Sequence, residues 1–114
     1  MSDCLFCKMV SGEITPDIVF ETESVLAFRD VNPQAPVHIL VIPKTHIATL
    51  ADLTEQHTVQ MGELMQAAKK IAEAEGLAES GYRTVFNCKE DAGQTVFHIH
   101  LHLLGGRKMG WPPG

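Results

Sequence analysis

Three histidines recur at every second position in the stretch His98-Ile99-His100-Leu101-His102 of this 114-residue chain. Side chains alternate between the two faces of a strand, so this spacing predicts that the three imidazoles share one face. Ile99, Leu101 and Leu103 then point the other way, into a core. Near neutral pH an imidazole can serve as nucleophile, proton carrier or hydrogen-bond donor to phosphate, and three on one face could supply all three functions. The alternative is a solvated strand face that is rich in histidine.

The same spacing argues against a simple metal site made of these three histidines. Neighbouring residues on one strand face lie about 6.6–7 Å apart, because a strand rises ~3.3 Å per residue. Zn–N bonds are only ~2.0–2.1 Å long, so adjacent imidazoles of the row cannot close a tetrahedral shell together. The row is therefore interpreted as catalytic or phosphate-binding.

Length and composition indicate one globular domain, residues 1–114, with an irregular tail at 105–114. A net charge of −5 without a basic cluster makes a nucleic-acid polymer an unexpected partner, whereas a small anion held by local amides and histidines stays open. No apolar run approaches the ~20 residues of a membrane span and no secretory signal begins the chain, so we expect no membrane partner and a cytoplasmic location. Three cysteines then favour free thiols or metal ligands over disulfides.

Hydrophobic periodicity predicts one long helix from Asp52 or Thr54 to Glu75, with Gly76 as its stop. A polar loop is expected at 88–95. Strands before and after a single helix predict an α+β fold with a mainly antiparallel sheet. The five expected strands span residues 18–21, 25–29, 38–42, 82–87 and 96–104.

The segment 93–106, which contains the three histidines, resembles the signature of the histidine triad superfamily. In that signature each of the first two histidines is followed by one apolar residue and the third by two. Segments 27–30 and 33–44 and the terminal Trp-Pro-Pro-Gly resemble its nucleotide-binding branch, Hint, so that the resemblance covers nearly the whole chain. It implies a HIT-like fold with a five-stranded sheet, and a homodimer in which the sheets of two subunits join across the interface. The long helix is a candidate interface element.

The resemblance also implies an activity, the hydrolysis of purine nucleoside phosphoramidates and acyl nucleotides. His100 would attack phosphorus to give a covalent nucleotidyl-histidine, and water would then release a nucleoside monophosphate such as AMP or GMP. A neutral imidazole has the nucleophilicity and the leaving ability that such a two-step displacement requires. Two alternatives stay open: dinucleoside polyphosphate hydrolysis, as in the Fhit branch, and a nucleotide-binding regulatory or partner-binding module with little turnover.

Further roles around phosphorus follow from the same resemblance. His102 and the backbone near Gly93 would bind the phosphate oxygens. Thr95 would place a hydroxyl near the leaving group, at a position where relatives often have serine. His38 matches a histidine close to the catalytic ring and would relay a proton, although a hydrogen-bonded core histidine is the alternative.

The nucleoside would occupy residues earlier in the chain. Asp30 resembles a carboxylate that accepts hydrogen bonds from both ribose hydroxyls, a task suited to two acceptor oxygens. The alternative for Asp30 is a purely structural role as a turn residue. Ile14, Phe28 and Val31 match an apolar slot for the base, and Asn87 matches a side chain that contacts phosphate or ribose.

Cys4 and Cys7 are separated by two residues, which is half of a zinc site and needs two further ligands. His46 and His98 would complete a Cys2His2 structural site, in an arrangement that resembles zinc-containing histidine triad proteins. His98 would then act by fixing the strand that carries His100, and the chemistry itself would need no cofactor. The alternative is two thiols buried in an apolar amino-terminal segment.

Overall fold

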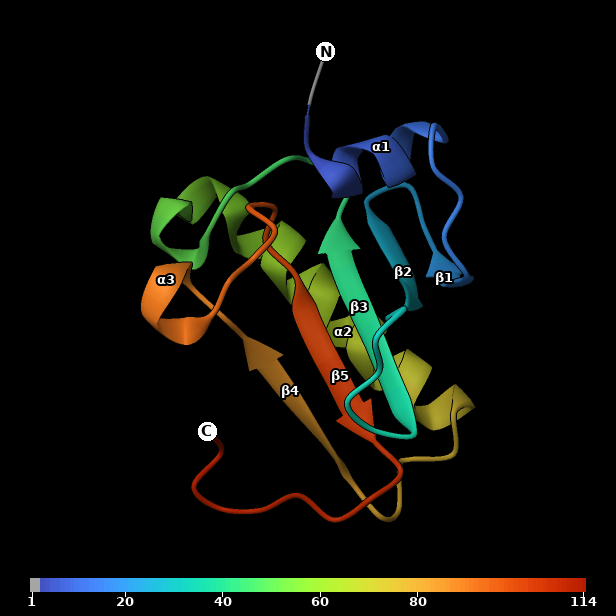
Figure 1. Cartoon of the computed structure of the whole chain (residues 1–114). Coiled ribbons are helices and arrows are strands. Elements are labelled where there is room, and N and C mark those ends of the chain that lie inside the picture. Colours follow the sequence, from blue (N-terminus) through green and yellow to red (C-terminus); the bar gives the residue numbers. More distant parts are fainter. Residues whose placement is uncertain (1–2) are drawn as a thin grey trace.

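The computed structural model describes residues 3–114, so the first two residues of the expected domain lie outside it. One antiparallel sheet forms the centre of the molecule, with the strand order β1-β2-β3-β5-β4 (Figure 1). The expected α+β class and five-stranded antiparallel sheet are confirmed. The strands are β1 (Ile18–Glu21), β2 (Val25–Arg29), β3 (Val37–Pro43), β4 (Tyr82–Phe86) and β5 (Leu101–Gly105).

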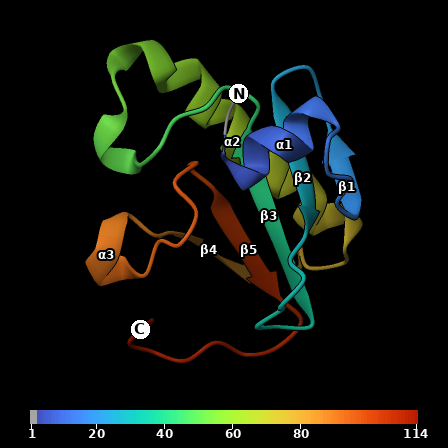
Figure 2. The same cartoon turned by 45° about the horizontal axis from the view of Figure 1, so that its top comes forward.

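Helices cover both faces of the sheet (Figure 2). The 17-residue α2 (Thr58–Ala74) packs on one face and the short α1 (Leu5–Ser11) lies over the other. Successive strand residues serve opposite faces, as strand geometry requires. Leu101 and Leu103, with alternate residues of β2 and β3, join the core beneath α2. Phe6 of α1 caps the second core, which contains Leu26, Phe28, Leu40 and Ile42.

The expected helix begins later than Asp52 or Thr54. Two single 3-10 turns, Leu50–Asp52 and Glu55–His57, precede α2. In each turn the hydroxyl oxygen of the preceding threonine, Thr49 or Thr54, accepts a hydrogen bond from a backbone amide of the turn. The side chain of the third residue of the turn accepts in return from the threonine's own amide. Each capping box therefore closes only one turn. The expected stop is confirmed, because Gly76 adopts φ 78° and donates to the carbonyl of Glu73.

The expected strand 96–104 is wrong in its first half, since β5 begins only at Leu101. The ladders with β3 and β4 both end at this residue, where it pairs with Val41 and Phe86. Upstream the chain leaves the sheet, and the amide of Ile99 bonds instead to the carbonyl of Ile47. The three imidazoles nevertheless remain neighbours: Phe6 of α1 packs edge-on against His98 and His100, and the His100 and His102 ring centroids lie 4.9 Å apart.

Two short helices were not expected. The segment expected as a polar loop contains α3 (Lys89–Ala92), and the amino-terminal segment forms α1. Helices of four and seven residues are too short to give a periodic signal. Among the residues that the structure describes, no helix is long and apolar enough to cross a membrane.

Candidate active site

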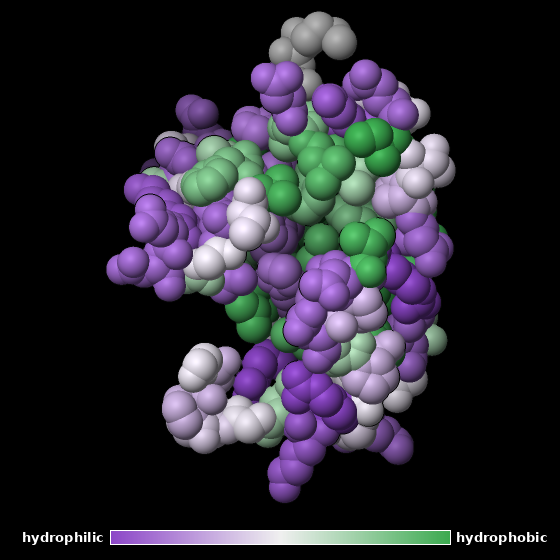
Figure 3. All heavy atoms as spheres, viewed as in Figure 1, coloured by the Kyte–Doolittle hydropathy of each residue, from purple (hydrophilic) through white to green (hydrophobic). Residues whose placement is uncertain are grey.

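A cavity of ≈ 470 Å³ lies beneath α1 and is lined by most of the residues that the sequence suggested for nucleotide binding. Figure 3 shows apolar residues gathered below α1 on this face of the molecule. Leu5, Met9 and Asp17, which the sequence did not point to, line the cavity as well. The expected site residues that line it are Ile14, Phe28, Asp30, Val31, Thr95, His100 and His102.

Three expected residues, His38, Asn87 and Gly93, are not among the described residues that line this cavity. Gly93 ends α3 with φ 82°, and its amide donates to the carbonyl of Glu90. The next amide, that of Gln94, bonds to Lys89. These two backbone donors are therefore engaged within the α3 turn and are not directed at a phosphate.

His100 is buried and held in one tautomer. Its Nδ1 lies 2.8 Å from the carbonyl oxygen of His98, which can only accept, so Nδ1 carries the proton and Nε2 the lone pair. Phe6 packs edge-on against this ring at 5.2 Å. Burial lowers the pKa of His100, although the bond to the His98 carbonyl and the charge of Asp30 oppose the shift. A neutral, oriented imidazole results.

His38 and His102 form a chain of fixed tautomers. The amide of Gln34 donates to His38 Nδ1 over 3.0 Å, so His38 carries its proton on Nε2. That proton is donated to His102 Nδ1 over 2.9 Å, which leaves Nε2–H of His102 as the donor available to a ligand. Burial and then the neighbouring His100 and His38 lower the pKa of His102 to about 4, while Asp30 opposes them.

The two carboxylate oxygens of Asp30 have different partners. Oδ1 accepts a 2.8 Å bond from the amide of Asn32, which is the turn role considered as the alternative. Oδ2 lies 3.4 Å from His38 Nε2, and the residue lines the cavity. The carboxylate therefore stabilises the turn through one oxygen and faces the site with the other.

Cys4, Cys7, His46 and His98 converge, with ligand atoms all within 4.8 Å of one another. His98 donates from Nε2 to the Pro43 carbonyl at 2.8 Å, so its Nδ1 presents a lone pair to the group. Nδ1 of His98 lies 3.3 Å from Nδ1 of His46 and 3.3 Å and 3.5 Å from Sγ of Cys4 and Cys7. The edges of a zinc tetrahedron are about 3.3–3.4 Å for two nitrogens and about 3.6 Å for nitrogen and sulfur, from the bond lengths of such sites. The donor set therefore fits a tetrahedral metal ion.

A second group of possible ligands does not fit. Asp30, His38 and His102 also lie within 4.8 Å of one another. A metal on His38 Nε2 would force the proton onto Nδ1, which already accepts from the Gln34 amide. This group is a hydrogen-bonded network rather than a metal site.

Gln94 is a buried polar residue that the sequence did not reveal. Its side chain accepts from the amide of Lys89 and donates to the carbonyls of Ala48 and Val96. These bonds hold the loop that carries Thr95 against the rest of the molecule. A single glutamine without periodic context gives no sequence signal for such a role.

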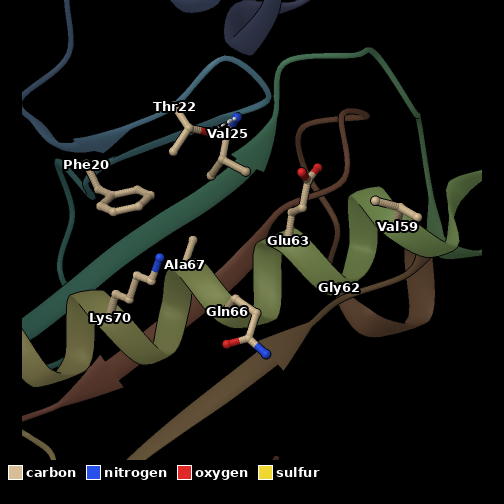
Figure 4. Close-up of a pocket in the computed structure, with 9 residues that line it drawn as sticks. All are labelled: Phe20, Thr22, Val25, Val59, Gly62, Glu63, Gln66, Ala67 and Lys70. Carbon is tan, nitrogen blue, oxygen red and sulfur yellow. Dashed lines mark hydrogen bonds between the residues drawn. The ribbon is translucent and has the colours of Figure 1, made fainter.

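A separate cavity of ≈ 400 Å³ lies on the other side of the sheet, between α2 and the β1-β2 hairpin (Figure 4). Glu63 and Lys70 of α2 point toward the β1-β2 hairpin, which contributes Phe20 and Val25 to the lining. It is lined by neither histidine nor cysteine among the described residues. The histidine cavity is therefore the candidate active site.

The fold and the histidine cavity together define a member of the HIT family, and the HIT domain matches residues 11–109. The chain belongs to this family. It is 48% identical to the purine nucleoside phosphoramidase of Escherichia coli, over 95% of this chain and 91% of that one. It is 51% identical to a 14 kDa zinc-binding protein of Zea mays, over 99% and 89% of the two chains. The crystal structure of a HIT family hydrolase from Legionella pneumophila superposes with a TM-score of 0.97 at 56% identity, covering 98% of this chain and all of that one.

Proposed function

We propose that this protein is a purine nucleoside phosphoramidase that also accepts acyl nucleotides and releases a nucleoside monophosphate such as AMP or GMP. One observation carries the proposal. The carbonyl of His98 holds His100 with its Nε2 lone pair free for attack, beside an Nε2–H donor on His102. The name and similarity of the Escherichia coli relative support the P–N bond as the target.

The first step forms a bond between His100 Nε2 and phosphorus and breaks the P–N bond. The His100 ring gains positive charge, which the His98 carbonyl stabilises through Nδ1–H. His102 Nε2–H donates to a phosphate oxygen on which charge accumulates. The departing amine takes a proton from solvent, relayed by the hydroxyl of Thr95, which lines the same cavity. Water then attacks phosphorus and returns one proton to solvent by the same relay, and His100 leaves as a neutral imidazole.

Binding of the nucleoside uses the opposite end of the cavity. Ile14, Phe28 and Val31 provide the apolar slot for a purine, and the Oδ2 of Asp30 accepts from the ribose hydroxyls. Asn87 and Gly93 are left out of the proposed site because they do not line the cavity. His38 acts through His102, by keeping its Nε2 protonated.

The Cys2His2 group is proposed to hold one structural zinc ion. The tetrahedral edges and the neutral donor face of His98 support it, as does the similarity to a zinc-binding protein from maize. Zinc would supply no chemistry to the reaction. It would tie α1 to the segment whose His98 carbonyl orients His100.

The decisive experiment is steady-state hydrolysis of adenosine 5′-phosphoramidate by the wild type and by His100→Ala. We expect the variant to lose turnover by at least roughly a thousandfold while still binding AMP, because the lost group forms the covalent bond. His57→Ala is the matched control, since His57 lies in the 3-10 turn before α2 and does not line the cavity. Mass mapping of a rapidly quenched reaction should find the nucleotide on His100. Full activity of His100→Ala, or nucleotide on His98 or His102, would overturn the assignment.

A further inference from the structure

The two thiols of the Cys2His2 group lie close enough to bond to each other. Cys4 and Cys7 belong to a group whose ligand atoms all lie within 4.8 Å of one another. The amide of Lys8 donates to the carbonyl of Cys4, so the two cysteines bracket a closed helical turn. Residues three apart in such a turn have Cα atoms about 5 Å apart, inside the ~4.4–6.8 Å range of disulfides. The backbone therefore already has the spacing that a disulfide requires.

The same two thiols can be reached from solvent. Both cysteines are half-buried, and Sγ of Cys7 lies 3.3 Å from Nδ1 of His46, which is exposed. His98 closes the opposite side of the group and exposes none of its surface. A thiolate that small oxidants reach, beside a second thiol that resolves the first product, is the arrangement of reversible redox sites.

The helix α1 connects these thiols to the histidine cavity. Leu5, Phe6 and Met9 of this helix line the cavity. Phe6 also packs edge-on against the ring of His100 at 5.2 Å. A metal ion on the two thiolates would hold the helix to His98, whose carbonyl orients His100. A chemical change that releases α1 from His98 therefore alters the wall of the cavity.

On the basis of the structural zinc ion proposed above, we infer that Cys4 and Cys7 are a redox switch. Their oxidation to a disulfide by hydrogen peroxide releases the metal, detaches α1 from the segment before β5 and weakens nucleotide binding. In the first step the Cys7 thiolate attacks one peroxide oxygen and the O–O bond breaks, which gives a sulfenic acid and hydroxide. The Cys4 thiolate then attacks the oxidised sulfur, and the S–S bond forms as a second hydroxide leaves. The sulfur atoms lose two electrons in all, the peroxide gains them, and two protons from solvent convert both hydroxides to water.

Oxidation removes both charged ligands of the metal. The thiolate is the form of cysteine that binds zinc, and a disulfide carries no thiolate charge. Two imidazoles alone do not close a tetrahedral structural site, so the ion leaves. The Nδ1 lone pair of His98 then lies buried without the cation it faced, which favours separation of α1 and entry of water. A dithiol reductant reverses the exchange, and the metal binds again.

The first test uses zinc-loaded protein with Cys88→Ser, which leaves Cys4 and Cys7 as the only thiols of the chain. On addition of hydrogen peroxide, we expect a colorimetric chelator to detect release of about one zinc ion per chain. The intact mass should fall by that of two hydrogens relative to the metal-free reduced chain, as the disulfide forms. Dithiothreitol with added zinc should restore both quantities. Zinc retained after both thiols are oxidised, or oxidation that yields no disulfide between them, would overturn the inference.

Binding of AMP, measured by calorimetry, tests the link to the histidine cavity. The Kd for AMP should rise roughly 3- to 10-fold on oxidation, the size expected when part of an apolar lining is lost. Dithiothreitol with zinc should reverse this rise, whereas it does not reverse oxidation of Met9, the oxidisable methionine of the cavity. Cys4→Ser in the same Cys88→Ser protein is the matched control, because its single thiol cannot form the internal disulfide, and peroxide should leave its Kd unchanged.

The outcomes separate this inference from the proposed function. Zinc release with an unchanged Kd for AMP, or an equal response to peroxide in Cys4→Ser, would show that the disulfide does not control the cavity. Reduced protein that contains no zinc would contradict the structural metal ion and the switch together. Reduced, zinc-loaded protein that fails to hydrolyse adenosine 5′-phosphoramidate would instead contradict the proposed activity alone.

Discussion

Each histidine of the motif has a different partner and therefore a different task. A carbonyl fixes His100 as a nucleophile, and the carbonyl of Pro43 fixes His98 with its lone pair toward the cysteines. His102 takes its tautomer from His38, whose own tautomer is set by the Gln34 amide. Identical side chains are thus prepared for the proposed roles of nucleophile, metal ligand and phosphate donor by backbone carbonyls and by His38.

The depressed pKa of His102 makes stability depend on pH. In the folded protein this pKa is about 4, whereas an unfolded histidine titrates near ~6.5. Between these values the unfolded chain binds more protons, so stability is present above pH ~6.5 and is lost as the pH falls toward 4. We expect His102 to contribute roughly 1–3 kcal/mol to this loss, after allowance for solvent screening. Urea titrations at pH 7, 5.5 and 4.5 measure the free energy of unfolding. This free energy should fall less with decreasing pH in His102→Gln than in the wild type. An equal fall in both proteins would refute the assignment.

Asp30→Asn should raise KM for ribonucleotide substrates more than it lowers kcat. The contact is remote from phosphorus and is made in the ground and transition states alike, so it is uniform binding. An amide is a weaker acceptor than a carboxylate by about 1–2 kcal/mol, which corresponds to a rise in KM of roughly 5- to 30-fold. The asparagine oxygen can still accept from the Asn32 amide, so the turn should persist. A 2′,3′-dideoxy substrate is the control, and an equal loss with it would show that the ribose is not the partner.

At the scale of elements, α1 depends on contacts outside itself. A seven-residue helix is marginal in isolation, and here Phe6 and the two cysteines attach it to the segment before β5. Cys4 also caps the helix, because its sulfur accepts from the amide of Cys7. Loss of these contacts should make α1, which covers the histidine cavity, more mobile.

Cys4→Ser should therefore reduce bound zinc from about one ion per chain toward none and lower Tm by several degrees. A structural zinc ion contributes its binding free energy directly to folding. kcat should fall as well, since the carbonyl that orients His100 belongs to the ligand His98. Elemental analysis and thermal melts check this outcome. Cys88→Ser, outside the cluster, is the matched control and should change neither quantity.

The sequence predicted the elements that a local residue pattern marks. It missed the features that depend on contacts with residues far away in the chain. Four strands lie within one residue of their expected ends, because each is a short run of strand-forming residues bounded by turn residues. The break before Leu101 could not be predicted from the local sequence, because it occurs where the ladders of β5 with β3 and β4 both end. Likewise, most of the histidine cavity was anticipated from its motif residues, but Leu5, Met9 and Asp17 reach it only through the fold.

At the scale of the whole molecule, the strand β4 forms one edge of the sheet and β1 forms the other (Figure 1). Within the described chain β4 pairs only with β5, so its other side presents unpaired backbone groups. Tyr82 on this strand and Met65 on α2 are 40% and 51% exposed, although both are large hydrophobic residues. We predict that two copies join along β4 and cover these side chains, which extends the sheet across the interface.

Met65→Glu should convert this dimer to a monomer. At 100° per residue, Met65 is turned about 240° from Val59, which lines the groove between α2 and the β1-β2 hairpin (Figure 4). Val59 is 73% exposed and apolar, so Val59→Glu adds the same charge on the flank of α2 that faces away from β4. Analytical ultracentrifugation should give about twice the 12.5 kDa chain mass for the wild type and for Val59→Glu, and the single-chain mass for Met65→Glu. A monomeric wild type, or dissociation caused by Val59→Glu alone, would place the interface elsewhere or remove it.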